Sequence, residues 1–302
     1  MKKTVRLLSI MAVIVAGCTT ACGQNAIKNT ADDSGKVKVM TSFYTMYDFA
    51  QKIGGEKVEI TNMVPSGTEP HDWEPSAIDI RNMEDADVFI YNGAGMEHWA
   101  EDILKSLDNS ELITVEASES VELIREGKEN DPHVWLDPEN AKIEMEHIKD
   151  AFIEADKDNA EYYNKNYETY SRQLDGLNQE FEETLSQVTN KDIIVAHKAF
   201  GYLCKAYGLN QIAIEGLMPD SEPDPARMEE IIQLAKKKEI NTIFFEELVS
   251  PKVANTIAKE IGAKTEVLNP LEGLSEEQVD AGEDYFSVMR TNLKQIKNAL
   301  EN

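Results

Sequence analysis

The sequence predicts an α/β protein with two lobes, each with a mainly parallel sheet flanked by helices, joined by one long linking helix. A length of 302 residues suits one large domain or two of ordinary size. The stretch 159–188 contains no proline and repeats large apolar residues every three or four positions, which is the spacing of one helix face. These residues are Tyr163, Tyr167, Tyr170, Leu174, Leu177, Phe181, Leu185 and Val188. Strand and helix patterns alternate on both sides of it, as in parallel sheets covered on both faces.

The individual elements follow from short β-branched and aromatic runs, separated by helical patterns that begin or end at proline or glycine. In the first half we expect strands over Val37–Thr41, Val58–Val64, Ala86–Tyr91 and Leu112–Val115, and helices over Tyr44–Ile53, Ser76–Asn82, Glu97–Leu107 and from Pro138. In the second half we expect strands over Asp192–Ala196, Gln211–Glu215, Thr242–Phe245 and Thr265–Leu268, and helices over Ala199–Tyr207, Pro225–Lys238, Pro251–Ile261 and Tyr285–Leu300. The expected lobes are therefore 37–158 and 189–302, with 159–188 as the linking helix.

The amino terminus has the pattern of an export signal. Basic residues precede the apolar run Leu7–Gly17, which is too short to span a bilayer but suits a signal peptide over residues 1–17. The sequence Val15-Ala16-Gly17-Cys18 resembles the lipobox of bacterial lipoproteins, so Cys18 is expected to carry lipid, with Cys22 as the weaker alternative. Residues 18–36 would then be a lipidated flexible tether, and the protein would be anchored at the extracytoplasmic face of the cell membrane. The alternative is an ordinary secreted protein.

Composition limits the classes of partner. The formal net charge of −26 argues against nucleic acid, which requires the opposite sign. It favours cations, although an acidic surface also serves solubility. Cys204 is the one cysteine after residue 22, so neither an internal disulfide nor a cysteine metal cluster is expected. We expect a monomer.

Three of the five histidines fall where a ligand site is expected. Open parallel sheets bind ligands beyond the carboxyl ends of their strands. His71 lies in the loop after the second expected strand, His133 lies in a proline-bracketed loop, and His197 directly follows a strand. His98 and His147 have the surroundings of surface or rim groups, whereas the other three could converge at a cleft between the lobes.

Three imidazoles and one carboxylate form a full tetrahedral donor set for Zn²⁺. Glu246 and Glu247 follow a buried strand in the second half, and adjacent residues there point to opposite sides. We choose Glu246 as the fourth ligand and keep Glu247 in reserve. The expected metal ligands are thus His71, His133, His197 and Glu246. One of the nearby acids could accept the distal N–H of a ligating histidine: Glu69, Asp72, Asp131 or Asp137.

Four motifs in order along the chain resemble those of the lipid-anchored zinc- and manganese-binding proteins that serve ATP-binding-cassette (ABC) metal importers. They are Glu69–Ser76, Asp131–Pro138, Ala196–Tyr202 and Phe245–Glu247. The resemblance covers essentially the whole chain after the tether, and the second motif is the most specific. It implies that His71 and His133 come from the first lobe, that His197 and the acid come from the second, and that the long helix is a stiff hinge.

The resemblance leaves the metal open between zinc and manganese. By this resemblance, the manganese binders of the family have Glu as the third ligand and Asp as the fourth. This chain has His197 at the third position. Imidazole-rich ligation suits zinc and added carboxylate suits manganese. Many zinc members carry a histidine-rich acidic loop between the first two ligands, and the corresponding segment 122–130 contains no histidine. Zinc leads, with manganese as the alternative.

The expected function is capture of zinc and its delivery to the membrane permease and ATPase subunits of an ABC importer. We expect no enzyme activity. A zinc hydrolase is the alternative from another class, but the chain has no His-Glu-x-x-His helix and no Gly-x-Ser-x-Gly elbow. A surface adhesin is a third class, since relatives have been discussed in that role, and no binding patch for a host ligand is evident in the sequence.

Overall fold

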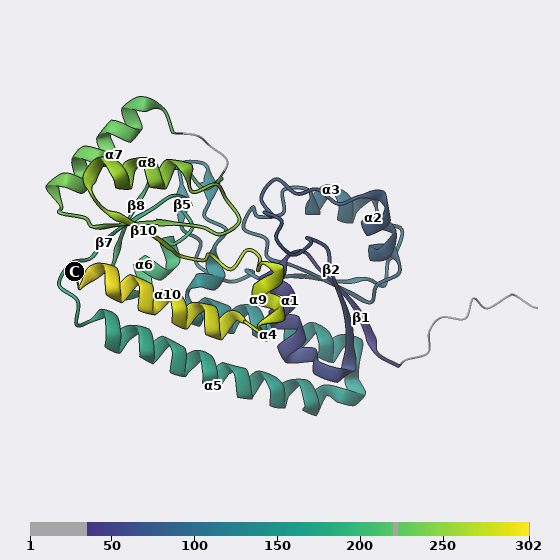
Figure 1. The fold of residues 1–302 in the computed structure, drawn as a ribbon. Coiled ribbons are helices and arrows are strands. Elements are labelled where there is room, and N and C mark those ends of the chain that lie inside the picture. The colour runs from purple at the N-terminus through teal and green to yellow at the C-terminus, as the bar shows by residue number, and fades with distance from the viewer. Residues whose placement is uncertain (1–34, 220–222, 302) are drawn as a thin grey trace, which may run out of the picture. The chain divides into compact units, whose positions relative to one another are not determined.

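Two four-stranded sheets, both entirely parallel, organise the described residues of the structure, a computed structural model that covers 35–219 and 223–301 (Figure 1). The predictions of a signal peptide, a lipidated Cys18 or Cys22 and most of the tether fall outside these residues. The predicted fold class is confirmed, with two parallel sheets, flanking helices and a long helix in the middle of the chain.

The first sheet has the order β2-β1-β3-β4. Its strands are β1 (Val37–Thr41), β2 (Val58–Asn62), β3 (Val88–Tyr91) and β4 (Ile113–Glu116). The helices of this half are α1 (Tyr44–Gly54), α2 (Ala77–Glu84), α3 (Ala100–Ser106) and α4 (Pro138–Ala155), with 3₁₀ turns η1 (Gly55–Lys57), η2 (Val134–Leu136) and η3 (Lys157–Asn159). The charged loop expected after β4 contains a small antiparallel pair, β5 (Arg125–Glu126) and β6 (Glu129–Asn130).

The second sheet has the order β10-β9-β7-β8. Its strands are β7 (Asp192–Val195), β8 (Asn210–Ala213), β9 (Thr242–Phe245) and β10 (Lys264–Val267). The helices of this half are α6 (Gly201–Tyr207), α7 (Pro225–Lys237), α8 (Lys252–Ile261), α9 (Glu276–Asp280) and α10 (Tyr285–Leu300). Of these, the short helix α9 is not predicted by the sequence pattern.

Both faces of each sheet are buried along its central strands, as the alternation of side chains in β1 and β7 shows. Val39 of β1 belongs to a large core cluster under α1 and α4, whereas its neighbour Met40 packs with Phe89 and Trp99 in a smaller cluster near α2 and α3. In the second sheet, Ile194 of β7 packs with residues of α7 and α8, and the strand residues on either side of it join the large cluster.

The long helix α5 (Ala160–Leu185) connects the two halves and contacts both (Figure 1). Its apolar face lies in the large core cluster, which continues from the first sheet to the second. Asn166 donates to the carbonyl of Ile53 in α1. Glu180 accepts hydrogen bonds from Nε and Nη2 of Arg290 in α10. A helix fastened to both halves through a shared core suits a stiff connection.

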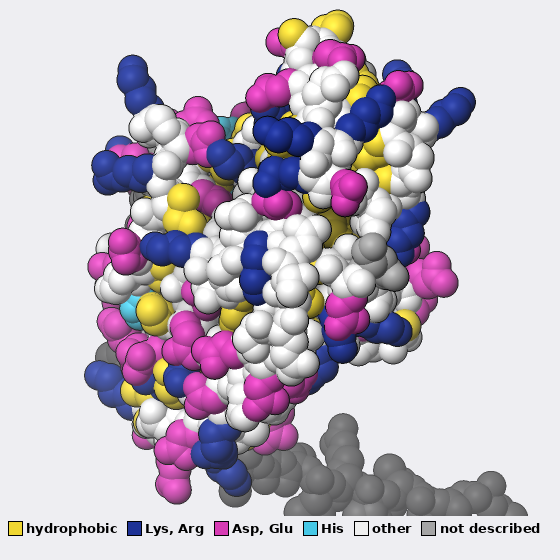
Figure 2. All heavy atoms as spheres, turned by 90° about the vertical axis from the view of Figure 1, so that its left-hand side faces the viewer, with side chains coloured by type: hydrophobic (Ala, Val, Ile, Leu, Met, Phe, Trp, Pro, Cys, Tyr) yellow, Lys and Arg dark blue, Asp and Glu magenta, His cyan; other side chains and the backbone are white. Residues whose placement is uncertain are grey.

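The described surface carries mixed charge. Figure 2 shows the side of α7 and α8, where Asp and Glu side chains are interspersed with Lys and Arg and the hydrophobic side chains are scattered. In the part of the chain that the structure covers, the exposed large hydrophobic residues are Ile78, Met218 and Val279. None of the described helices combines the length and the apolar character that crossing a membrane requires.

Candidate metal centre

His71 lies in the loop between β2 and α2. Ser76 ends this loop in a capping box with Asp79, which fixes the start of α2. Within the loop, Glu69 Oε1 accepts a hydrogen bond from the backbone N–H of His71 at 2.9 Å. The imidazole is buried and its Nε2 atom lies 3.2 Å from Nε2 of His133.

His133 is held by Asp131 in the loop that follows β6. Asp131 Oδ1 lies 3.1 Å from the backbone nitrogen of His133 and 2.7 Å from its Nδ1 atom. Because a carboxylate accepts, the proton sits on Nδ1 and Nε2 is left for another partner. Among the four acids expected to accept the distal N–H of a histidine, Asp131 accepts the Nδ1–H of His133. Asp137 instead caps α4 by accepting the backbone N–H of Glu139.

His197 follows β7 and adopts the opposite orientation. Its Nε2 atom lies 2.7 Å from the carbonyl oxygen of Leu217, which can only accept, so Nε2 carries a proton. Its Nδ1 atom faces two carboxylates, with Glu246 Oε1 at 2.9 Å and Glu272 Oε1 at 3.9 Å.

Glu272 comes from the loop after β10 and was not chosen from the sequence. First-half residues hold this loop by its carbonyl oxygens: Trp135 Nε1 donates to Pro270 at 2.7 Å and Thr45 Oγ1 donates to Leu271 at 2.5 Å. Leu271 is fully buried and has a φ of 63°, a left-handed conformation that is rare for leucine and persists only where surrounding contacts impose it. Asn292 of α10 also exchanges two hydrogen bonds with the backbone of Asn269, so residues of both halves hold the loop.

The structure brings His71, His133 and His197 together with Glu272, their donor atoms all within 4.8 Å of one another. Glu272 Oε1 lies 2.9 Å from His133 Nε2 and 3.4 Å from His71 Nε2. Donors placed about 2.0–2.1 Å from a tetrahedral zinc ion are roughly 3.3 Å apart. The separations among His71, His133 and Glu272 are close to this value, whereas His197 Nδ1 lies farther away, 3.9 Å from Glu272 Oε1. The donor set of three imidazoles and one carboxylate suits zinc, and all four side chains are at most 4% exposed.

Glu246, the fourth ligand chosen from the sequence, lies beside the clustered donors. It is buried, but the group of four that could hold a metal contains Glu272 in its stead. Glu246 directly follows β9 and its Oε1 atom contacts Nδ1 of His197. Glu247 turns outward, as adjacent strand residues do, and accepts from Asn269 Nδ2 and Gln278 Nε2. The strand-end rule that selected Glu246 applies equally to β10, and the turn-forming segment 269–273 after it carries Glu272.

The histidines expected at the surface are outside this group. His98 is exposed, with Nε2 3.6 Å from Glu74. His147 is half-buried in α4, and its Nδ1 atom lies 3.0 Å from the carbonyl oxygen of Ala117.

The charges of the centre shift the pKa values of its own donors. Burial alone lowers the pKa of His197, but the charge of Glu246 and its hydrogen bond outweigh burial and raise that pKa to about 10. Burial alone would also lower the pKa of His133, but the hydrogen bonds to Asp131 and Glu272 outweigh burial and raise it. Burial would raise the pKa of Glu272, but the charge of His71 and the hydrogen bond from His133 hold it well below its usual range. Glu272 is therefore an ionised carboxylate. His133 and His197 must lose protons before a cation can bind their nitrogens.

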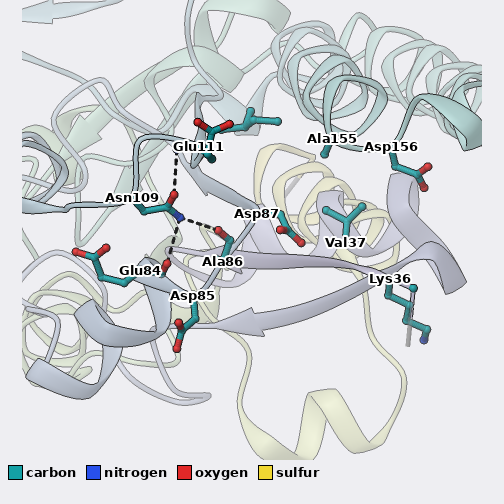
Figure 3. Close-up of a pocket in the computed structure, with 12 residues that line it drawn as sticks. Lys36, Val37, Glu84, Asp85, Ala86, Asp87, Asn109, Glu111, Ala155 and Asp156 are labelled. Atoms are coloured by element: carbon teal, nitrogen blue, oxygen red, sulfur yellow. Dashed lines mark hydrogen bonds between the residues drawn. The ribbon is translucent and has the colours of Figure 1, made fainter. Parts of the chain in front are cut away.

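A separate cavity of about 690 Å³ lies at the amino ends of strands β1, β3 and β4, opposite the strand ends that the histidine loops follow (Figure 3). Asn109 closes one side by donating to the carbonyls of Glu84 and Ala86. Acidic side chains line it, among them Asp87 and Glu111, and none of the four clustered donors does. Since the histidine loops follow strand ends, this cavity is not part of the centre.

Residues 39–299 match the protein family described as ZnuA, zinc-uptake complex component A, periplasmic. The chain belongs to this family. It is 41% identical to the high-affinity zinc uptake system protein ZnuA of Bacillus subtilis, over 95% of this chain and 96% of that protein. The zinc-binding lipoprotein AdcA of Streptococcus pneumoniae is 38% identical over the whole chain, which spans 62% of the length of AdcA.

Solved structures of ZnuA-family relatives share the fold. The Zn(II)-bound ZnuA-like domain of S. pneumoniae AdcA is 42% identical, with a TM-score of 0.81 over 89% of this chain and 100% of that domain. The laminin-binding protein Lmb of Streptococcus agalactiae, described as bifunctional with adhesin and metal-transporting activity, is 34% identical, with a TM-score of 0.82 over 88% of this chain and 99% of that one.

Proposed function

We propose that this ZnuA-family protein captures Zn²⁺ outside the cytoplasm and delivers it to the permease of an ABC importer, with His71, His133, His197 and Glu272 as ligands. The observation that carries the proposal is the clustering of three imidazole nitrogens and one carboxylate oxygen within 4.8 Å of one another, a donor set that suits tetrahedral zinc. Manganese prefers six ligands and more oxygen donors, so a buried set with a single carboxylate favours zinc.

The proposal includes the anchor and the lobes. Lipid on Cys18 would hold a monomer at the membrane, which the sequence pattern Val15–Cys18 supports. We place the first lobe at 37–158, the linking helix at 159–188 and the second lobe at 189–302. Each lobe then supplies two ligands, and the shared core and α5 favour a small rocking motion over a wide opening.

The direct test is metal binding by a soluble form of residues 24–302, beside His133→Ala and His147→Ala variants. We expect one tightly held zinc in the parent, preferred over manganese in competition. Loss of the buried His133 imidazole should weaken zinc binding at least ~100-fold, or about 2.7 kcal/mol. The His147→Ala control, which alters the same half outside the group, should stay within about threefold of the parent.

Growth tests the delivery step. A deletion strain should grow poorly at low zinc, and the parent gene should restore growth whereas the His133→Ala gene should not. Normal growth of the deletion strain would contradict delivery, and tighter binding of manganese by the parent would contradict the choice of metal.

Zinc affinity should increase with pH. A metal ligand must be deprotonated, and the pKa values of His197 (about 10) and His133 are raised in the metal-free protein, so binding at neutral pH releases protons. For each proton released, the apparent affinity should rise about tenfold per pH unit between pH 6 and 8. Calorimetry in buffers with different ionisation enthalpies counts the protons. An affinity that is flat across this range would show that the metal-free histidines are already neutral.

A further inference from the structure

We propose that zinc reaches the buried donors through a cavity in the second lobe, at whose inner end Glu246 is the last carboxylate that the ion meets before the four ligands. The proposal rests on the zinc-binding function above and concerns how the ion enters and leaves. It assigns Glu246 the role of a transient donor on the path to the four ligands.

The donors have almost no direct contact with solvent. His71 is 4% exposed, His133 0%, His197 1% and Glu272 2%. An opening between the lobes would have to break the hydrogen bonds that Trp135 and Thr45 make to the Glu272 loop, and would have to separate a continuous apolar core. A path that leaves these contacts intact is therefore favoured.

A cavity of about 200 Å³ provides such a path. It is lined by residues that follow β7 and β9 and by the start of α8, including His197, Glu215, Glu246, Ser250 and Lys252. Ser250 and Lys252 are exposed, whereas His197 and Glu246 are buried, so the cavity extends from the surface to the metal centre. Its volume far exceeds the ~10–15 Å³ that one water needs, so a partly hydrated ion fits.

Glu246 lies between this cavity and the four donors. A second cavity, of about 10 Å³, is lined by both Glu246 and Glu272, so Glu246 borders both spaces. Its Oε1 atom lies 2.9 Å from His197 Nδ1, the nitrogen that also faces Glu272. An ion that binds the Glu246 carboxylate takes the place of this contact and meets the His197 nitrogen next. The chemistry suits a divalent cation, because acids line the inner part of the cavity.

The first test narrows the mouth without touching a ligand. Ser250→Trp places an indole at the exposed end of the cavity, and Val279→Trp adds the same ring at an exposed position of α9 that does not line it. Zinc association is followed by stopped flow and dissociation by an excess of chelator. We expect both rates to fall at least tenfold in Ser250→Trp with the equilibrium affinity within threefold of the parent, because an obstructed path raises the barrier in both directions. Val279→Trp should match the parent.

The second test changes charge at the mouth. Lys252→Glu should speed zinc association several-fold at low ionic strength, and salt should weaken the effect. Lys165→Glu on α5 makes the same change in net charge away from the cavity and should have a smaller effect.

Parent-like rates in Ser250→Trp, or equal effects of the two lysine variants, would overturn the route and leave the zinc-binding function intact. A weaker equilibrium affinity of Ser250→Trp with unchanged association would indicate a disturbed centre and would also overturn it. A parent that binds no zinc would overturn both proposals.

Discussion

Replacing Glu272 with glutamine is expected to weaken zinc binding at least ~100-fold, whereas Glu246→Gln should weaken it only about tenfold. Glu272 Oε1 lies within 3.4 Å of nitrogens of both His71 and His133, and hydrogen bonds from both lobes hold the loop that carries it. Loss of this charge leaves three imidazoles without the anionic donor that completes the set. Glu246 contacts His197 alone among the four, and partners of ligating groups typically contribute 10–100-fold in affinity.

Glu247→Gln is the matched control. The Glu247 side chain is directed away from the histidines and accepts hydrogen bonds from Asn269 and Gln278. The zinc affinity of the Glu247→Gln variant should therefore be within threefold of the parent. All three variants add one amide in place of a carboxylate within the second lobe, and circular dichroism shows whether each is folded. If Glu246→Gln lost more affinity than Glu272→Gln, Glu246 would be the fourth ligand, as first expected from the sequence.

Replacing Glu144 with leucine is expected to stabilise the metal-free protein by about 1–3 kcal/mol at pH 8. Glu144 lies on α4 with an exposure of 0%, and neither carboxyl oxygen has a hydrogen-bond partner among the described residues. Burial, and then the charge of Glu97, raise its pKa well above the usual value. Leucine has a similar volume and no polar atoms to bury.

The pH dependence of this gain has a definite sign. With a folded-state pKa above the unfolded value of about 4.3, the acid is neutral in both states at low pH and its burial is least unfavourable there. Stability is lost as pH rises from the unfolded pKa towards the folded one, so the advantage of Glu144→Leu should grow from pH 4 to pH 8. Urea unfolding at several pH values measures it. Glu154→Leu, at an exposed position of the same helix, should change stability by less than about 0.5 kcal/mol. A less stable Glu144→Leu protein would show that the acid makes favourable contacts.

The elements that the sequence predicts well are those whose pattern is local. Helix α5 was expected over 159–188 and runs over Ala160–Leu185, because one uninterrupted apolar face specifies both its type and its length. The bounds of the strands agree with the predicted ranges within a few residues, because a buried β-branched run between turn residues indicates where a strand begins and ends. The β5–β6 pair was missed because a two-residue strand gives no periodic signal.

The histidines of the candidate centre are predictable from the sequence, whereas the choice between Glu246 and Glu272 as the fourth ligand is not. The rule that ligands lie beyond strand ends places His71, His133 and His197 in suitable loops, and the structure brings the three together. The same rule admits the acids after β9 and β10, and the pattern of one strand cannot show how many of the histidines each acid contacts. The position of Glu272 depends on hydrogen bonds to its loop from Trp135 and Thr45, more than a hundred positions away, and from Asn292 of α10.

X-ray absorption at the zinc edge of the zinc-loaded soluble protein, with Glu272→Gln beside it, tests the proposed centre most directly. We expect four ligands in the parent, three imidazoles and one oxygen, at about 2.0–2.2 Å from the ion, and a perturbed oxygen shell in the variant. A six-coordinate ion dominated by oxygen, fewer than three imidazoles, or a spectrum unchanged by Glu272→Gln would contradict the assignment of His71, His133, His197 and Glu272 as the zinc ligands.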